Sequence, residues 1–263
     1  MATQGQTRAD KRSARSEARA EAQRKAAQAQ RRRQLTIAVS VVLVAVIALT
    51  TVLIAINRQG DDRTPGQDIV ADYSGIPATG MTLGQPDAPV TIVEYADFQC
   101  PYCTQFALTI EPQIIQDFVA TGQVRYEFRP MPIISPLALD NSGNESVLAA
   151  QAAMCAADQG KFWDFHHLLY TKQTGENIGT FSSSNLITYA AEGGLDVTTF
   201  TQCMVNNTYQ QQVIDSYNNA VSQGISSTPT LVINGTQVNL TSSGYDKLKT
   251  QIQQAIDGEP IED

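Results

Sequence analysis

The sequence predicts an α/β fold with a helical insertion, preceded by a single N-terminal transmembrane helix. Strand-like segments at 90–95 and 124–128 enclose a helix-like segment, and a further strand pair and a helix lie near the C-terminus. A helical block from about 136 to 222 separates these two parts. This order indicates one sheet covered by helices, with the block inserted into it. The uncharged run at 35–56 predicts the transmembrane helix.

A basic leader, residues 1–34, precedes the uncharged run. Its first 33 residues hold ten Lys or Arg against three Asp or Glu, a charge of +7, so the total of −8 leaves −15 for the rest. The twenty-two residues from Leu35 to Ile56 are enough, at about 1.5 Å each, to cross a hydrocarbon core of about 30 Å. The positive leader places the N-terminus in the cytoplasm and the acidic part outside the cell membrane. That acidity argues against nucleic-acid binding.

A cleaved signal peptide is the competing interpretation of this N-terminus. Its apolar core would be about 7–15 residues long, followed by a small-residue cleavage site. The run here is longer, and Ala55-Ile56-Asn57-Arg58 offers no such site. We therefore expect a retained single-pass anchor, a linker at 57–80 rich in Gly, Pro and Asp, and one domain at 81–263.

The strands of the domain are expected in the following places. A short edge strand at 81–84 and a turn at 85–89 come first. The run at 90–95 is β-branched and nearly continuous, as in a strand that is buried on both faces. The segment at 124–128 alternates between apolar and polar residues, which is typical of a strand.

A helix is expected between those two strands, beginning near Thr104. Pro112 lies inside the pattern and predicts a kink rather than a break, because proline lacks an N–H and crowds the carbonyl four residues before it. Gly122 is expected to end the helix. The apolar face recurs every four residues, at Phe106, Ile110, Ile114 and Phe118.

The rest of the chain supplies the insertion and the end of the sheet. The Asn234-Gly235 pair predicts a two-residue hairpin turn. Helices are expected at 146–158, 161–172, 185–192, 198–205 and 209–222, strands at 230–233 and 237–240, and a last helix at 245–256.

A C-x-x-C motif, Cys100-Pro101-Tyr102-Cys103, stands between the first long strand and its helix. The first N–H groups of a helix are unpaired and carry partial positive charge, so a thiolate placed there is stabilised. Cys100 is therefore the candidate nucleophile of a redox-active pair. Half of a zinc site and a structural disulfide are alternatives that the motif alone leaves open.

The motif and its flanking residues resemble the DsbA-type thioredoxin-fold thiol:disulfide oxidoreductases, in particular their membrane-anchored extracytoplasmic bacterial branch. The resemblance covers about residues 80–257 and implies a thioredoxin-like fold. It rests on Leu83-Gly84, Pro86, Ala88-Pro89-Val90-Thr91-Ile92-Val93-Glu94-Tyr95, Asp97-Phe98-Gln99-Cys100-Pro101-Tyr102-Cys103 and Ser227-Thr228-Pro229-Thr230.

The resemblance also assigns roles to residues. Cys100 would be the exposed attacking thiolate, and the more buried Cys103 would resolve the mixed disulfide. Thr228 and Pro229 would form a cis-proline loop that binds the client. Glu94 would be a buried acid that moves the proton of Cys103; a carboxyl in an apolar strand should have a raised pKa. Partial exposure of Glu94 at the strand end is the alternative.

The dipeptide between the cysteines, Pro101-Tyr102, departs from the strongest oxidants of the family, which have His beside the proline. Tyrosine cannot carry the positive charge with which histidine stabilises a thiolate. We therefore expect a less oxidising pair. Cys-Pro-Tyr-Cys also occurs in glutaredoxins, but the helical insertion and the predicted export argue against that family.

Two further cysteines, Cys155 and Cys203, fall in separate helices of the insertion. Because disulfides persist outside the cell and the cysteine count is even, we expect a structural disulfide between them. Two buried free cysteines are the alternative. No metal site is expected from His166 and His167, since neighbours on a helix point about 100° apart and the chain has no second C-x-x-C.

These observations predict a thiol:disulfide oxidoreductase that introduces disulfides into exported proteins through Cys100 and Cys103, without a cofactor. Its partners would be clients with free cysteines and a quinone-linked membrane protein that reoxidises it. A reductase or isomerase is the nearer alternative. A redox-inert binding module or metal chaperone is the more distant one.

Overall fold

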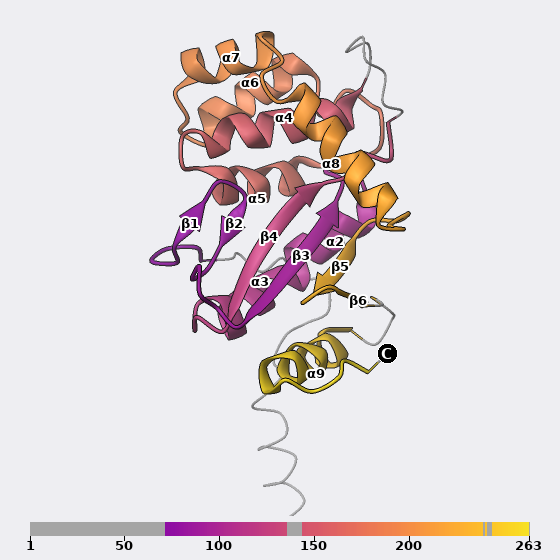
Figure 1. Cartoon of the computed structure of the whole chain (residues 1–263). Helices are drawn as coiled ribbons and strands as arrows, with labels where there is room; N and C mark the ends of the chain where they lie inside the picture. Colours follow the sequence, from indigo (N-terminus) through magenta and orange to yellow (C-terminus); the bar gives the residue numbers. More distant parts are fainter. Residues whose placement is uncertain (1–71, 136–143, 239, 241–243, 263) are drawn as a thin grey trace, which may run out of the picture. The chain divides into compact units, whose positions relative to one another are not determined.

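Strands β3 (Val90–Ala96) and β4 (Val124–Pro130) run parallel at the centre of the sheet. The computed structural model describes residues 72–135, 144–238, 240 and 244–262, and within them the sheet has six strands in the order β1-β2-β4-β3-β5-β6 (Figure 1). The predicted thioredoxin-like α/β fold with a helical insertion is confirmed. The outer strands are β1 (Ala78–Thr79), β2 (Thr82–Leu83), β5 (Thr230–Ile233) and β6 (Thr236–Val238).

The edge of the sheet differs from the prediction. The segment at 81–84 was expected at the edge, but β2 pairs with both β1 and β4, so β1 is the edge strand. Gly80, with φ of 57°, allows the tight turn between β1 and β2. The predicted linker therefore contributes its last residues to the sheet.

The helix after the C-x-x-C begins at Pro101, three residues before the predicted start, because proline is already constrained to a helical φ at the first position. It is interrupted at Ile110, so that α2 (Pro101–Thr109) and α3 (Glu111–Ile114) are separate. The predicted kink at Pro112 is thus wrong in kind and place. Pro112 has no N–H for the carbonyl four residues earlier, and a π-helical turn, η1 (Ile115–Val119), follows α3.

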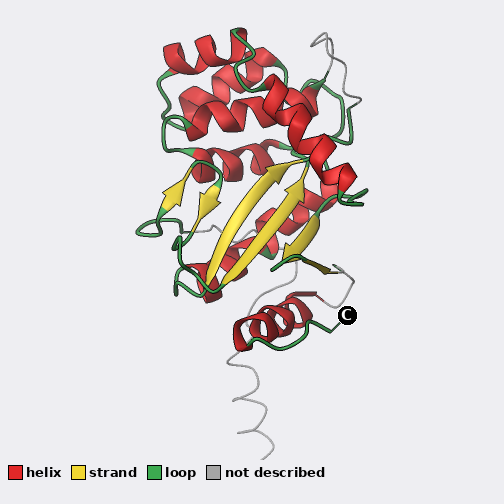
Figure 2. Cartoon of the chain, viewed as in Figure 1, coloured by secondary structure: helices red, strands yellow, loops and turns green. Residues whose placement is uncertain are grey.

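The insertion consists of helices gathered beyond the ends toward which β3 and β4 run (Figures 1 and 2). Helix α4 lies at its centre and contacts the other four, and most of its residues are buried. The five helices are α4 (Glu145–Ala157), α5 (Phe162–Lys172), α6 (Ser183–Glu192), α7 (Val197–Val205) and α8 (Gln210–Ser222).

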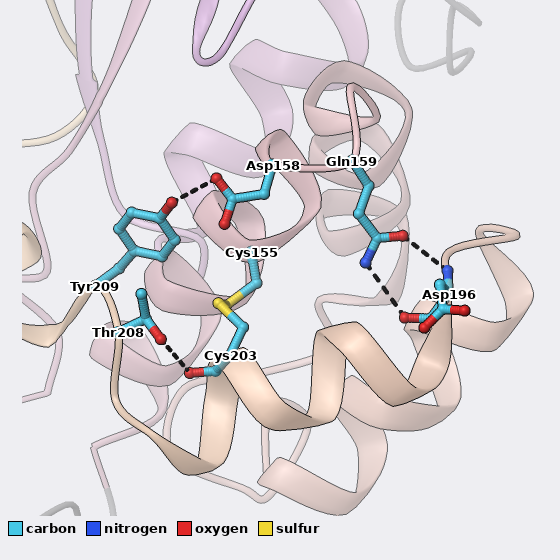
Figure 3. Close-up of a disulfide and its surroundings, with 7 residues drawn as sticks. All are labelled: Cys155, Asp158, Gln159, Asp196, Cys203, Thr208 and Tyr209. Atoms are coloured by element: carbon cyan, nitrogen blue, oxygen red, sulfur yellow. Dashed lines mark hydrogen bonds between the residues drawn. A yellow bond between two sulfur atoms is a disulfide. The ribbon is translucent and has the colours of Figure 1, made fainter.

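A disulfide between Cys155 of α4 and Cys203 of α7 joins two helices of the insertion (Figure 3). The Cα atoms of the pair are 6.0 Å apart. Beside it, the Gln159 side chain donates to the Asp196 carbonyl and accepts from the Asp196 N–H, at 3.2 and 2.7 Å. Covalent and polar links therefore hold the same two helices together.

The C-terminal part closes the sheet. Asn234 and Gly235 have φ of 47° and 87° and form the predicted turn between β5 and β6. Helix α9 (Gly244–Asp257) follows, and its Tyr245 hydroxyl and Lys249 ammonium donate to one oxygen of Asp117 in η1, at 2.9 and 2.8 Å. These contacts fix α9 against the helical segment that follows the C-x-x-C.

Within the described part of the chain, no helix has the length and apolarity needed to cross a membrane. The predicted leader at 1–34, the predicted transmembrane helix at 35–56 and most of the predicted linker lie outside the described residues.

Candidate active site

Cys100 and Cys103 lie at the start of α2, directly beyond the end of β3. Cys100 is the N-cap residue, and Pro101 is the first residue of the helix. The Cys100 side chain is only 4% exposed and Cys103 is fully buried, whereas Tyr102 between them is 73% exposed. The predicted exposure of Cys100 is therefore wrong, because the chain around residue 228 covers its sulfur. Cys103 is the more buried of the two, as predicted.

The environment of Cys100 favours its thiolate. A hydrogen bond from the Cys103 thiol is the main reason that the pKa of Cys100 falls to about 6. The Thr228 side chain and the backbone N–H groups of Tyr102 and Cys103 act in the same direction, while burial opposes them. Those N–H groups are the unpaired donors of the first helical turn.

The environment of Cys103 favours its neutral thiol. Burial is the main cause that raises the pKa of Cys103 well above its ordinary value, and its hydrogen bond to Cys100 and the charges of Cys100 and Glu94 add to the shift. The two sulfurs therefore hold one proton between them at neutral pH, and it resides on Cys103.

The Thr228–Pro229 peptide bond is cis and lies beside Cys100. The protonated Cys100 thiol donates to the Thr228 carbonyl at 3.5 Å, although the two residues are 128 positions apart. Strand β5 begins directly afterwards, and Thr230 pairs with Tyr95 of β3. Because β3 also leads to the dithiol, the pairing of β3 with β5 brings the loop and the cysteines together.

Glu94 is fully buried in β3, which rules out the alternative of partial exposure. One of its oxygens, Oε2, accepts a hydrogen bond from the Tyr126 hydroxyl at 2.7 Å. Burial raises the pKa of Glu94 to about 7, and the Tyr126 hydrogen bond partly offsets this. A carboxyl with this pKa can both donate and accept a proton near neutral pH.

Two buried residues beside Glu94 were not predicted as part of the site. Glu111 of α3 and His166 of α5 are fully buried, and together with Glu94 each places one oxygen or nitrogen within 4.8 Å of the others. Neither cysteine belongs to this set. Glu111 could have been found from the sequence, because it is an acidic residue between the apolar positions Ile110 and Ile114. His166 was considered only as a metal ligand, although aromatic residues surround it in the sequence.

Polar side chains also fix the loop that carries the cysteines. The Asp97 carboxylate accepts hydrogen bonds from the N–H groups of Gln99, Ile133 and Ile134, at 2.8 to 2.9 Å. Burial raises the pKa of Asp97, and these hydrogen bonds oppose the shift. Asp97 thus ties the residues before the dithiol to the chain that leaves β4.

Gln99 ties the same loop to the helical insertion. Its buried amide nitrogen donates to the hydroxyls of Ser135 and Ser146, at 2.6 and 2.8 Å. Its amide oxygen accepts from the Asn177 N–H at 2.6 Å, and its backbone carbonyl accepts from the Gln173 side chain at 2.7 Å. The residue that precedes Cys100 is therefore held by three segments of the chain.

Residues 77–254 match the family model described as Thioredoxin, which is more than half of the chain. The chain belongs to the thioredoxin family. The matched range contains the cysteine pair, the loop at Thr228 and the whole helical insertion.

The similar proteins fall into two groups that differ in how much of their own length the chain covers. Disulfide bond formation protein D of Bacillus subtilis is 28% identical over 204 residues, which are 77% of this chain and 85% of that protein. The crystal structure of oxidised BdbD from Bacillus subtilis superposes with a TM-score of 0.60 at 28% identity and covers 75% of this chain and 100% of that one.

A second group of relatives is much longer. The Na(+)/H(+) antiporter NhaA 3 of Salinispora tropica is 34% identical over 154 residues, or 58% of this chain. The chain spans only 21% of that antiporter. The similarity to the antiporter is thus confined to a small part of that protein.

Proposed function

We propose that this protein is a thiol:disulfide oxidoreductase that introduces disulfides into exported proteins through Cys100 and Cys103. The observation that carries the proposal is the placement of the two sulfurs: Cys100 is the N-cap residue of α2 beside the Thr228 carbonyl, and Cys103 is fully buried within the first turn. These surroundings lower the pKa of Cys100 to about 6 and raise the pKa of Cys103. A thiolate that is stable at neutral pH favours the reduced pair, so the oxidised pair readily accepts electrons.

The exchange proceeds in two steps. In the oxidised protein, a client thiolate attacks the Cys100 sulfur, which breaks the Cys100–Cys103 bond and forms a mixed disulfide. Cys103 leaves as a thiolate and takes a proton from Glu94. A second client thiolate then attacks the client's sulfur in the mixed disulfide and releases the Cys100 thiolate. The client loses two electrons and gains a disulfide, and the protein gains the two electrons.

Surrounding residues would guide the client. Thr228 and Pro229 lie beside Cys100 and would offer backbone groups to the client's extended chain. Pro101 sets the start of the helix, and the exposed ring of Tyr102 provides contact area. Because the Cys100 sulfur is nearly covered, a client would have to reach it beside the Thr228–Pro229 loop. No cofactor takes part, and Cys155 with Cys203 serves as a structural disulfide.

The location and the reoxidation of the protein are part of the same proposal. Residues 1–34 would remain in the cytoplasm, 35–56 would cross the membrane, and 57–80 would connect the anchor to the domain at 81–263 outside. The printed name of Disulfide bond formation protein D supports a role in disulfide formation. A quinone-linked membrane protein would return the reduced pair to the disulfide.

Trapping of clients tests this function. Replacing Cys103→Ser removes the resolving thiol, so we expect mixed disulfides between Cys100 and exported proteins, visible as reductant-sensitive adducts. Cys100→Ser is the matched control and should form none. An absence of adducts with Cys103→Ser would contradict the proposal and favour the redox-inert module.

A reductase is the second candidate, and Tyr102 is the observation that favours it. Titration of the pair against glutathione separates the two functions, since a potential near that of thioredoxin, about −270 mV, would exclude the oxidase. We expect Tyr102→His to make the pair more oxidising, by about 30 mV for each tenfold gain in the equilibrium constant. Tyr102→Phe, which adds no charge, should leave the potential near that of the natural protein.

A further inference from the structure

Three fully buried residues, Glu94, Glu111 and His166, bring two carboxyl groups and an imidazole together from β3, α3 and α5. Oε2 of Glu111 lies 3.6 Å from Nε2 of His166. His166 sits among the rings of Phe98, Phe128, Phe162, Trp163 and Tyr170, with centroids 4.9 to 5.7 Å away. The site therefore has the low polarity of an aromatic core.

The two carboxyl groups of this set cannot both be charged. A buried carboxylate without a cationic partner is costly, and a second one beside it adds repulsion. Among the described residues, His166 is the sole ion-pair partner of Glu111, and burial lowers its pKa to about 3, so it is neutral. At least one of the two acids therefore keeps its proton.

Hydrogen bonding decides which acid can become charged. Glu94 has a donor in place, the Tyr126 hydroxyl at 2.7 Å. Both oxygens of Glu111, both nitrogens of His166 and the remaining oxygen of Glu94, Oε1, have no partner at hydrogen-bond geometry among the described residues. The Tyr73 hydroxyl acts on Glu111 and favours its charged form, but burial outweighs it and raises the pKa of Glu111 well above its ordinary value. Glu94 is thus the acid whose charged form already has a hydrogen-bond donor. A protonated Glu111 is the group that can donate a second hydrogen bond, to Oε1 of Glu94.

We propose that Glu111 is a positioning residue for disulfide exchange: it keeps its proton and turns its O–H toward Oε1 of Glu94 when Glu94 becomes ionised. When Glu94 is protonated, the Glu111 hydrogen turns to Nε2 of His166 instead. This inference rests on the proposed function, in which Glu94 gives a proton to Cys103. The hydrogen of Glu111 never leaves its residue and only changes its acceptor.

The other titratable groups that face this set stay neutral or lie at its border. Burial raises the pKa of Tyr126, Tyr170 and Tyr73, so their phenols keep their hydrogens. The reduced Cys103 thiol is also neutral at neutral pH, because its pKa is raised. Of the carboxylates that act on these phenols, Asp97 lies at the dithiol loop and Asp164 is exposed on α5.

The consequence for the reaction is a smaller cost for ionising Glu94. Each hydrogen bond to a carboxylate favours its charged form and lowers its pKa. With Tyr126 as the sole donor, Glu94 would hold its proton more tightly and release it less readily to the Cys103 thiolate. A second donor from Glu111 therefore makes Glu94 a better proton donor to the Cys103 thiolate.

Carbon-13 NMR of the reduced full-length chain, labelled at the glutamate carboxyl carbons, tests this directly. Glu94→Gln and Glu111→Gln assign the two buried signals. We expect the Glu111 signal to remain that of a protonated acid through neutral pH. We expect Glu111→Leu, which removes the donor, to raise the pKa of Glu94 by about one unit, a tenfold change in its dissociation constant. Glu176→Gln, at an exposed position, is the control and should change neither signal.

Glu111→Gln keeps the test decisive if Glu111→Leu fails to fold. The glutamine amide still donates, so the pKa of Glu94 should stay close to that of the natural protein. A fall in the pKa of Glu94 in this variant would mean that Glu111 is charged, and it would overturn the proposal. A stoichiometric metal ion in the purified protein, detected by elemental analysis and lost in Glu111→Gln, would overturn it as well, because the ion would hold both acids in their charged forms.

The trapping experiment distinguishes a failure of this inference from a failure of the proposed function. If Cys103→Ser forms adducts but Glu111→Leu leaves the pKa of Glu94 unchanged, only the role of Glu111 is wrong. If Cys103→Ser forms no adducts, the disulfide-exchange function is wrong whatever the NMR titration shows.

Discussion

Cys100 and Cys103 carry the same thiol within one helical turn, and their surroundings make them chemically different. Cys100 receives hydrogen bonds from donors that favour its charged form, whereas Cys103 is enclosed by apolar groups that favour its neutral form. One helix start thus provides both a nucleophile and a proton-carrying leaving group. The difference arises from position in the helix rather than from residue type.

The reactivity of Cys100 should follow its lowered pKa. Because the thiolate is the nucleophile, the rate of alkylation of the reduced protein should rise with pH and level off above a midpoint near 6. Stopped-flow alkylation with iodoacetamide in the Cys103→Ala and natural proteins measures this midpoint. Alanine removes the Cys103 donor and should move the midpoint upward in the variant, and equal midpoints in both proteins would contradict the assigned hydrogen bond.

Glu94 should make folding stability depend on pH. Its pKa is raised from 4.5 to about 7 in the folded protein, so the folded state binds more protons than the unfolded state between these values. The contribution of Glu94 to stability is therefore fully present below pH 4.5 and is lost as pH rises from 4.5 through 7. Glu94→Gln removes this decrease, and its free energy of unfolding at pH 7 should exceed that of the natural protein by on the order of 3 kcal/mol.

Denaturant unfolding of both proteins at several pH values checks the Glu94 prediction. The difference between them should be small near pH 4.5 and should stop growing above 7. Glu176→Gln is the control, because it makes the same substitution at an exposed position outside the buried set. A constant gap between the natural protein and Glu94→Gln at every pH would show that packing rather than ionisation causes it.

From the sequence, some residues of the candidate site could be recognised by their chemical type, but their surroundings in the fold could not be predicted. Glu94 could be recognised as a candidate site residue because an acidic side chain is unusual within an apolar strand. The cover over Cys100 could not be predicted, since it comes from Thr228, 128 positions away. Glu111 and His166 were not predicted because they come close to Glu94 only in the folded chain, and each lies on a different element.

Helix α4 is the element on which the insertion depends. It contacts each of the other four helices, and its disulfide to α7 fixes one of those contacts covalently. Its first turn also holds Ser146, which accepts a hydrogen bond from Gln99 beside the nucleophile. Helix α4 thus connects the disulfide at one end of the insertion with the dithiol loop at the other.

Removal of the Cys155–Cys203 disulfide should lower stability without abolishing the chemistry. Cysteines separated by 48 positions close a long loop, and the chain-entropy model assigns such a bridge about 4 kcal/mol. The double variant Cys155→Ala with Cys203→Ala should therefore unfold at lower denaturant concentration. The alkylation rate of Cys100 at pH 7 is the control and should stay close to that of the natural protein; a large change would mean that the disulfide also shapes the active site.

The order of the elements could be read from apolar periodicity, because helices and strands bury faces with different repeats. Two local features could not. Strand β1 consists of two exposed residues within a segment that is rich in Gly and Pro, so its periodicity is too short to detect. The interruption at Ile110 depends on how the chain adjusts around Pro112, and proline permits both a kink and a break.

The whole molecule combines a described domain with an N-terminal region whose role is proposed from charge and hydropathy. The predicted leader, anchor and domain have distinct compositions, which is why the division could be proposed from the sequence. The family match begins at residue 77, after the predicted anchor and most of the predicted linker. The matched part of the chain therefore does not include the residues that are predicted to attach it to a membrane.

Deletion of residues 1–56 should release the protein from membranes and leave its thiol chemistry unchanged. The expected result is a shift from the membrane fraction to the soluble fraction, with the same pH profile of Cys100 alkylation. Mass measurement of the full-length protein from cells is the companion experiment. A mature N-terminus near residue 57 would show cleavage and contradict the retained anchor.

The distance in sequence between Cys100 and Thr228 also has a consequence for biosynthesis. Chains are made from the N-terminus, so both sulfurs of the pair leave the ribosome well before the loop that faces them. An incomplete chain holds its cysteines without the Thr228 carbonyl, without β5 and without the pairing of β5 with β3. Cys100 therefore acquires its final surroundings only after Thr228 and β5 have been added to the chain.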